Sequence, residues 1–399
     1  MVPSALPSER VFNVFLSRSG TLPLSISLCS DADGEYQDDL KEASRTLDML
    51  IPFLHRSKYL NLNTPLVTML PLQHLEREGL GSLETVILSR SRMLLHNEPD
   101  LSGALLPLLH APHLRRLWIG IAFPIFQCTD WSKLTHLCIY PYIQGVKLSD
   151  IIVILSMSPN LMECSIPLEG DFEGDTPLRP LSLTKLRRLT INSHGTGSAT
   201  TNRFFDLLTV AVLQEFSIVE GRWVHDSWPA VYPSIGDLFL RSSCPLLKFS
   251  IDSSYSGPGL PEGHAHSMLA LLRVMIDLEE LTLLNGDFIN DDLLNTLSVI
   301  SPTSSDVICP SLTRICFRDA YAFSEKALVD FLSARCSPPP LCPVTPLGVV
   351  LDDPRPHLAS RLAQFGQKIQ FRPSYRISNG MQEVQTRGRL ELWDWEDMT

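Results

Sequence analysis

The stretch Ala111–Ile119 (APHLRRLWI) joins a small residue, a proline and a leucine to a strand-like alternation of apolar and polar side chains. The same phrase returns at Ser158–Ile166 (SPNLMECSI) and at Cys309–Phe317 (CPSLTRICF). A phrase that recurs along a chain indicates stacked structural units, because one such unit cannot bury its apolar face alone. Repeats of this kind favour a binding function over catalysis.

The spacing of the phrase indicates the type of repeat. Its copies follow one another at steps of 20 to 34 residues, with a mean of about 29, at the long end of the leucine-rich-repeat range. We therefore predict an α/β fold, an irregular leucine-rich-repeat solenoid with parallel strands on its concave face and helices on its convex face. The alternative is an α/β domain whose strands merely share leucine-rich patterning. The first leucine of each copy is Leu83, Leu114, Leu134, Leu161, Leu186, Leu213, Leu246, Leu278 or Leu312.

Segments with helical spacing lie between the strand phrases, and polar residues that favour helix N-termini precede them. The predicted helices cover residues 151–156 after Ser149-Asp150, 204–210 after Asn202, 293–300 after Asn290-Asp291, and 327–334 after Ser324. Strand followed by helix, repeated at this period, is typical of a solenoid with two layers.

The two ends of the chain differ from the middle, and we predict three regions. Residues 1–56 form an N-terminal segment with a capping strand at 22–28 and an acidic loop at Asp31–Asp39. Residues 57–352 form the repeats. Residues 353–399 form a C-terminal cap, with a helix at 359–368 and a strand at 369–371, followed by a polar tail. Two tryptophans among acids near its end, in Leu392–Asp397 (LWDWED), indicate either a flap over the final repeat or a docking peptide.

The composition excludes several classes of protein. With 44% hydrophobic and 19% charged residues, the 399-residue chain can form a continuous core. A formal net charge of −11 disfavours nucleic acid and anionic membranes as partners. The nine cysteines include no C-x-x-C pair, which is typical of a reducing compartment. Without a recognisable signal peptide or membrane-length apolar stretch, we expect a cytoplasmic or nuclear protein.

Motifs for chemistry are weak. Asp31–Glu42 has the length of a calcium loop, but its glycine stands at the fourth place instead of the sixth. The pairs His264/His266 and His110/His113 lack further metal ligands at useful spacing, and Gly195–Ser198 lacks the lysine of a phosphate-binding loop. We expect no catalytic residue, no cofactor and no metal. An α/β hydrolase is the less favoured alternative.

The repeat offers a binding surface instead. Residues between the apolar positions of each strand face away from the core and line the concave side of a horseshoe. Aromatic residues and arginine, which are enriched at interface hot spots, cluster in the first half of this set. Acidic and basic residues alternate in the second half, which suits a protein or peptide partner. The set is Tyr59, Asn61, Thr85, Arg116, Trp118, His136, Tyr140, Glu163, Arg188, Glu215, Lys248, Glu280, Arg314 and Arg318.

The repeat phrases, together with Phe15–Leu28 (FLSRSGTLPLSISL) and Leu50–Ser57 (LIPFLHRS), resemble the F-box/leucine-rich-repeat proteins of mushroom-forming fungi. The resemblance runs from about Phe15 to the last repeats. It implies the substrate-recognition part of a receptor of a cullin-type ubiquitin ligase, in which the repeats hold a protein target. Only fourteen residues precede Phe15. We therefore expect that the F-box is missing, and that a ligase adaptor binds only if an F-box exists upstream. A free-standing repeat scaffold unrelated to ubiquitin is the alternative.

Overall fold

The computed structural model contains one long parallel sheet. It describes residues 9–29, 37–89, 102–121, 130–140, 147–168, 179–193, 198–220, 228–252, 264–284, 289–299, 307–318, 322–336, 347–352, 362, 365 and 369–371. Thirteen strands follow one another across the sheet in chain order, and every neighbouring pair is parallel. The strands are β1 (Leu24–Cys29), β2 (Ser57–Asn63), β3 (Thr85–Ser89), β4 (Arg116–Gly120), β5 (His136–Ile139), β6 (Glu163–Leu168), β8 (Arg188–Ser193), β10 (Glu215–Glu220), β11 (Lys248–Asp252), β12 (Glu280–Leu284), β13 (Arg314–Arg318), β14 (Gly348–Asp352) and β15 (Ile369–Phe371).

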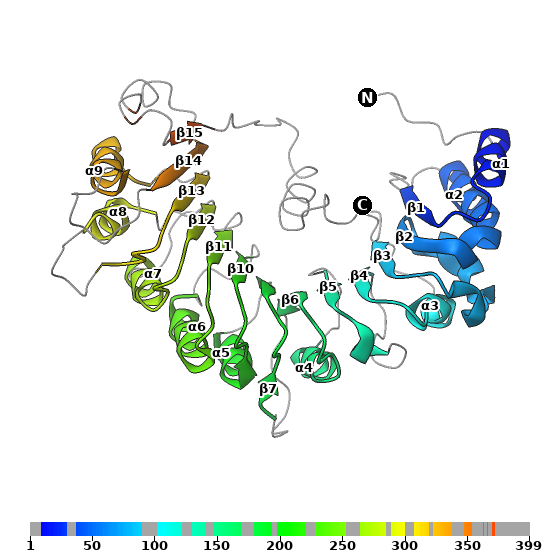
Figure 1. Ribbon diagram of the computed structural model, residues 1–399, viewed down its shortest axis with the longest axis horizontal. Coiled ribbons are helices and arrows are strands. Elements are labelled where there is room, and N and C mark those ends of the chain that lie inside the picture. Colours follow the sequence, from blue (N-terminus) through cyan, green and yellow to red (C-terminus); the bar gives the residue numbers. More distant parts are fainter. Residues whose placement is uncertain are drawn as a thin grey trace.

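Helices cover one side of this sheet. The molecule is an arc in which the strands line the inner side and the helices the outer side (Figure 1). The chain is thus an α/β leucine-rich-repeat solenoid, as the repeat phrase predicts. The helices are α1 (Glu9–Arg18), α2 (Gln37–Leu50), α3 (Ser102–Leu109), α4 (Leu148–Ser156), α5 (Ser198–Leu207), α6 (Trp228–Ser242), α7 (His264–Arg273), α8 (Asp291–Leu297) and α9 (Glu325–Cys336). Shorter 3-10 helices are η1 (Ile51–Arg56), η2 (Leu66–His74), η3 (Arg77–Leu80) and η5 (Trp131–Lys133), and β7 (Leu181–Ser182) pairs with β9 (Leu208–Thr209) in a small second sheet.

The unequal repeat steps have a structural counterpart on the outer side. The shortest step covers 20 residues, from Leu114 to Leu134. Among the residues described there, the connection between the strands contains one helix, the three-residue η5. The 33-residue step from Leu213 to Leu246 accommodates α6, which has 15 residues. Because a longer connection inserts a wider element between neighbouring units, the solenoid is irregular.

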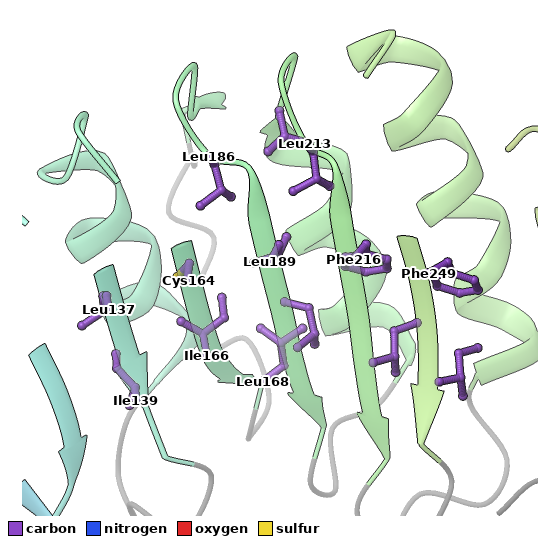
Figure 2. Close-up of a cluster of buried hydrophobic side chains, with 14 of the residues drawn as sticks. Leu137, Ile139, Cys164, Ile166, Leu168, Leu186, Leu189, Leu213, Phe216 and Phe249 are labelled. Carbon is purple, nitrogen blue, oxygen red and sulfur yellow. The ribbon is translucent and has the colours of Figure 1, made fainter. Parts of the chain in front are cut away.

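The core is a continuous layer between sheet and helices. All nine repeat leucines are at most 3% exposed. Across three successive strands Leu189, Phe216 and Phe249 occupy matching register positions (Figure 2). The Phe216 and Phe249 rings stack at 6.0 Å between centroids, and Phe239 of α6 meets Phe216 edge-on at 5.5 Å. Side chains of neighbouring units therefore bury one another, as stacked repeats require.

Two buried arginines tie down the ends of the described stack. Near the N-terminal end Arg56 donates to the carbonyl oxygen of Leu16 at 2.9 Å, to that of Gly20 and to Ser19 Oγ at 2.9 Å. It thereby caps carbonyl groups at the end of α1. Near the other end Arg335 of α9 is fully buried and donates to the carbonyl oxygens of Ile308 and Cys309 at 3.3 and 3.0 Å. Arg56 joins the two sequence stretches that carry the family resemblance.

Several local predictions are correct. Asn290 Oδ1 accepts from the Leu293 N–H at 3.0 Å, and Ser324 Oγ accepts from the Ala327 N–H at 3.2 Å, so both residues cap helices. The predicted strand at 369–371 is present as β15, paired with β14.

Other local predictions are wrong. α4 begins at Leu148, after Lys147, and Asn202 lies inside α5, which starts at Ser198 and ends at Leu207. The acidic loop does not extend to Asp39, because α2 begins at Gln37. Amphipathic spacing indicates a helix better than it indicates its first residue, since the first turn takes many residue types.

The loop part at 31–36 and Gly195–Gly197 lie outside the described residues, as do most of the 359–368 segment and the tail from 372 onwards. The expectations that the first segment is a solvated acidic loop and the second a flexible turn, and the boundaries of the three regions, stay predictions.

Leu189→Glu tests the register. Leu189 is 1% exposed, so the substitution places an uncompensated carboxylate in the core and is expected to destabilise the fold by about 3–5 kcal/mol. Thr184→Glu adds the same side chain at an exposed turn position and should cost little. Urea unfolding followed by circular dichroism measures both. Equal stability of the two variants would contradict the register.

The concave face as a candidate binding site

Strand register orders the inner face of the sheet into rows. The first row, one residue per strand, runs from Ser25 and Tyr59 through Thr85, Arg116, His136, Glu163, Arg188, Glu215, Lys248 and Glu280 to Arg314. The second row, two residues further along each strand, runs from Ser27 and Asn61 through Ile87, Trp118, Cys138, Ser165, Thr190, Ser217, Ser250 and Thr282 to Cys316. The predicted concave residues therefore occupy equivalent positions on successive strands.

The second half of the first row is a ladder of ion pairs. Arg188 is its centre: Nη1 lies 3.1 Å from Glu163 Oε2, and Nε lies 2.7 Å from Glu215 Oε2. Lys248 Nζ continues the ladder at 3.6 Å from Glu215 Oε1 and 3.8 Å from Glu280 Oε2. His136 Nε2 closes its other end, 3.5 Å from Glu163 Oε1. The alternating charges that the sequence shows are therefore paired with one another.

The environment of Glu163 shows how the ladder holds its charges. Burial raises the pKa of the Glu163 carboxyl, but the hydrogen bond with His136 and the charges of Arg188 and Arg116 outweigh burial. The pKa of Glu163 therefore lies below its ordinary value. The carboxylate is held ionised, which keeps the ladder intact at neutral pH.

Hydroxyl groups line the second row beside the ladder. Ser250 Oγ donates to Ser217 Oγ at 2.9 Å, and Asn192 Nδ2 donates to Ser165 Oγ at 3.0 Å. Ser165 and Thr190 are only 5% exposed. Short side chains in this row leave the longer charged residues of the first row room to bond across strands. The repeated L/F-S/T-I/L pattern in the sequence is the signal that would have revealed this row.

The first half of the concave face has a different chemistry. The first- and second-row positions of β2–β5 hold mostly aromatic, apolar and uncharged polar side chains. Their ionisable residues are Tyr59, Arg116, His136 and Cys138. Trp118, half-buried, stands between Ile87 and Cys138 in the second row. No residue of these two rows in β1–β5 is a carboxylate. We call these rows of β2–β5, together with Tyr140, the aromatic patch.

Other predicted concave residues are placed as follows. Tyr140 lies directly after β5, and its N–H donates to the carbonyl oxygen of Ile119 at 2.8 Å. Asn61 Nδ2 donates to Ser27 Oγ at 3.1 Å. Burial raises the pKa of Tyr59 to about 12, so its phenol stays protonated. Arg314 is exposed in the first row, and Arg318 lies at the end of β13, with its side chain outside the described residues.

His264 and His266, the more closely spaced histidine pair, lie in different environments. Both residues belong to the first turn of α7. His264 is buried, and its Nε2 lies 2.6 Å from Tyr232 Oη. Burial lowers the pKa of His264 to about 4. Within the described parts of the chain, no group of three or more His, Cys, Asp or Glu residues is arranged to bind a metal ion.

Three cysteine thiols have raised pKa values. Burial raises the pKa of Cys244 to about 11 and that of Cys309 to about 12, and it raises the pKa of Cys164 still further. These three thiols are protonated at neutral pH, whereas nucleophilic cysteine requires the thiolate.

The described helices include none that is long and apolar enough to span a bilayer.

Arg188→Met tests the ladder. The variant keeps the aliphatic stem but leaves Glu163 and Glu215 facing each other without a cation between them, so we expect a loss of about 1–3 kcal/mol of unfolding free energy. The neutral triple variant E163Q/R188M/E215Q should recover much of this loss. Urea unfolding at low salt and at about 1 M salt, where repulsion is screened, measures both. Strictly additive effects would show that these residues do not couple.

His264→Asn tests the buried histidine. The pKa of His264 is about 4 in the folded chain, against an ordinary value of 6.5. Between these two pH values the imidazole is therefore protonated in the unfolded chain and neutral in the folded chain. The fold should therefore lose about 1.4 kcal/mol per pH unit between pH 6.5 and 4 through this group. H264N should lack this part of the pH dependence. The exposed neighbour supplies the control, since H266N should retain it.

Comparison with known proteins gives no family and a distant structural likeness. No protein-family model matches the sequence, and no curated protein matches it. Among solved structures, the crystal structure of a TLR13–ssRNA13 complex aligns with 80% of this chain at 16% identity and a TM-score of 0.34. The aligned region covers 42% of that protein, so the chain spans less than half of its length. A likeness this distant carries no argument about ligands, and the absence of a nucleic-acid partner stays a prediction.

Proposed function

We propose that this chain is a protein-binding repeat module that holds its target against the aromatic patch. In this proposal it acts in the cytoplasm or nucleus as the substrate-recognition part of an F-box-type receptor of a cullin-type ubiquitin ligase. The chain itself performs no catalysis. It positions the target, and the ligase transfers ubiquitin.

The contrast between the two halves of the concave face carries the proposal. In the ladder half, Glu163, Arg188 and Glu215 bond one another, so a partner would have to break existing ion pairs to use them. In the other half, Arg116 is outside the ion-pair distances of the ladder, although its charge helps to lower the pKa of Glu163, and it stands beside Trp118 on β4. Tryptophan and arginine are the residue types most often found at the energetic centre of protein interfaces.

The resemblance to F-box/leucine-rich-repeat proteins supports the ligase part of the proposal. The residues that carry this resemblance, Phe15–Leu28 and Leu50–Ser57, meet through Arg56 at the first strands of the sheet. An adaptor-binding F-box would precede this end of the solenoid. The aromatic patch begins only one strand further on, at β2.

Affinity purification tests the proposal. The tagged full chain, its R116A/W118A variant and an R314A control are purified from the cells that produce the protein, and bound proteins are quantified by mass spectrometry. We expect at least one partner to be lost from R116A/W118A and retained by R314A, while all three chains melt at similar temperatures. Cullin-ligase subunits should accompany the purified chain if an F-box is present upstream. Identical partner sets for all three chains would contradict binding at the aromatic patch.

A further inference from the structure

A row of residues at the rim of the sheet is a feature that the proposed function leaves unused. It stands one position before the first concave row, where each chain segment enters its strand, and we call it the rim row. Backbone hydrogen bonds join its members, since each N–H donates to the carbonyl oxygen of the preceding member at 2.8 or 2.9 Å. The members are Lys58, Glu84, Arg115, Thr135, Met162, Arg187, Gln214, Leu247, Glu279 and Thr313.

The middle of the rim row presents two exposed cations, Arg115 and Arg187. Within the part of the chain that the structure describes, neither side chain makes an ion pair or a hydrogen bond. The charges that lower the pKa of Glu163 belong to other residues, Arg188 and Arg116 among them. Both guanidinium groups are therefore free to meet an anionic partner.

The carboxylates of the rim row do not neutralise these two arginines. Glu84 Oε1 lies 3.4 Å from Lys58 Nζ, and Glu279 stands three strand steps beyond Arg187. The members between these two glutamates include no carboxylate. Beside them the exposed Lys185 adds a positive charge, and its Nζ donates to a neutral acceptor, Asn160 Oδ1, at 2.6 Å. This stretch is thus locally basic in a chain of formal net charge −11.

We propose that Arg115 and Arg187 bind an extended acidic segment of the target, which lies along the rim row. The inference rests on the proposed function only in assigning this segment to the target. The rim row borders the aromatic patch, because Arg115 and Thr135 directly precede Arg116 and His136 in the chain. One partner can therefore cover the patch and the rim together, and opposite charges at the rim fix its orientation.

The spacing of the two arginines defines the segment that fits. Three strand steps, from β4 through β5 and β6 to β8, separate Arg115 from Arg187. At about 4.8 Å per step this is about 14 Å. In an extended peptide, residues four positions apart lie about 13 Å apart and point to the same side. The residue midway between them points to that side as well and meets Thr135 and Met162, so an acid-x-apolar-x-acid pattern matches the row.

Carboxylates of a protein fit this row better than a nucleic acid does. A nucleic-acid strand presents a phosphate at every nucleotide, and its binding proteins meet it with a continuous basic groove. Here Thr135 and Met162 separate the two arginines. The formal net charge of −11 also repels a long polyanion, whereas a short segment experiences mainly the local charge.

A peptide with this spacing tests the inference. The fluorescein-labelled probe consists of four repeats of Glu-Thr-Leu-Thr, because one exposed ion pair contributes little and repetition offers the matched pair in several registers. The full chain is titrated into the probe at about 0.1 M salt, where charges more than about 10 Å away are screened, and fluorescence anisotropy is measured. We expect R115E/R187E to weaken binding about fivefold or more. R45E/R273E, the same change at two exposed arginines of α2 and α7, should leave the affinity within about twofold.

A second probe tests the spacing. It has the same composition, but its four glutamates form one block, so neighbouring acids point to opposite sides of an extended peptide. We expect the full chain to bind this block probe about threefold or more weakly than the spaced probe.

Four results would overturn the inference. They are no detectable binding of the spaced probe, equal weakening by the two double variants, equal affinity for the spaced and block probes, and tighter binding of an oligothymidylate of the same charge through the same two arginines. Thermal melts of each variant establish that the fold is retained. The probes contain no target and no aromatic residue, so their failure leaves partner loss in R116A/W118A untouched. Identical partner sets in the purification would likewise leave the probe result in place.

Discussion

The structure depends on the shared register of its parallel strands. Each strand bonds its neighbours residue for residue, so the apolar positions of one unit meet those of the next. A single unit has too little surface to bury its leucines, and stability arises at the contacts between units. The repeat leucines are buried to the same extent from Leu83 to Leu312 because this condition holds along the whole sheet.

The same register governs the concave face. Neighbouring parallel strands lie about 4.8 Å apart, so a charged residue in one strand necessarily faces its equivalents on both sides. Like charges at such positions would repel, and the alternation from Glu163 to Glu280 avoids this. In that half of the face the charge pattern therefore has a sufficient structural explanation. We assign recognition of a partner to the aromatic patch, where Tyr59, Trp118 and Arg116 make none of the ladder's ion pairs.

Three of the polar side chains that the stacking leaves inside show how such groups are satisfied. Arg56 and Arg335 use their guanidinium groups to bond backbone carbonyls at turns where neither helix nor strand provides a partner. Tyr232 and His264 bond each other between α6 and α7, and burial keeps the imidazole neutral. These contacts make the solenoid sensitive to substitution at a few polar positions, since a buried polar group without a partner is costly.

The sequence by itself determined the architecture and the inner and outer sides of each strand. Both follow from local periodicity: Leu189 and Arg188 differ by one position, and alternation alone separates the core from the concave face. Helix boundaries such as those of α4 and α5 were less predictable, because first turns accept many residues. Only the tertiary structure decided that Arg188 bonds Glu163 and Glu215, that Arg56 holds α1, and that His264 bonds Tyr232. These partners lie 25 to 40 residues apart in the chain. The strand phrases place Glu163, Arg188 and Glu215 at equivalent positions, but which side-chain atoms bond there leaves no trace in the local pattern of a strand.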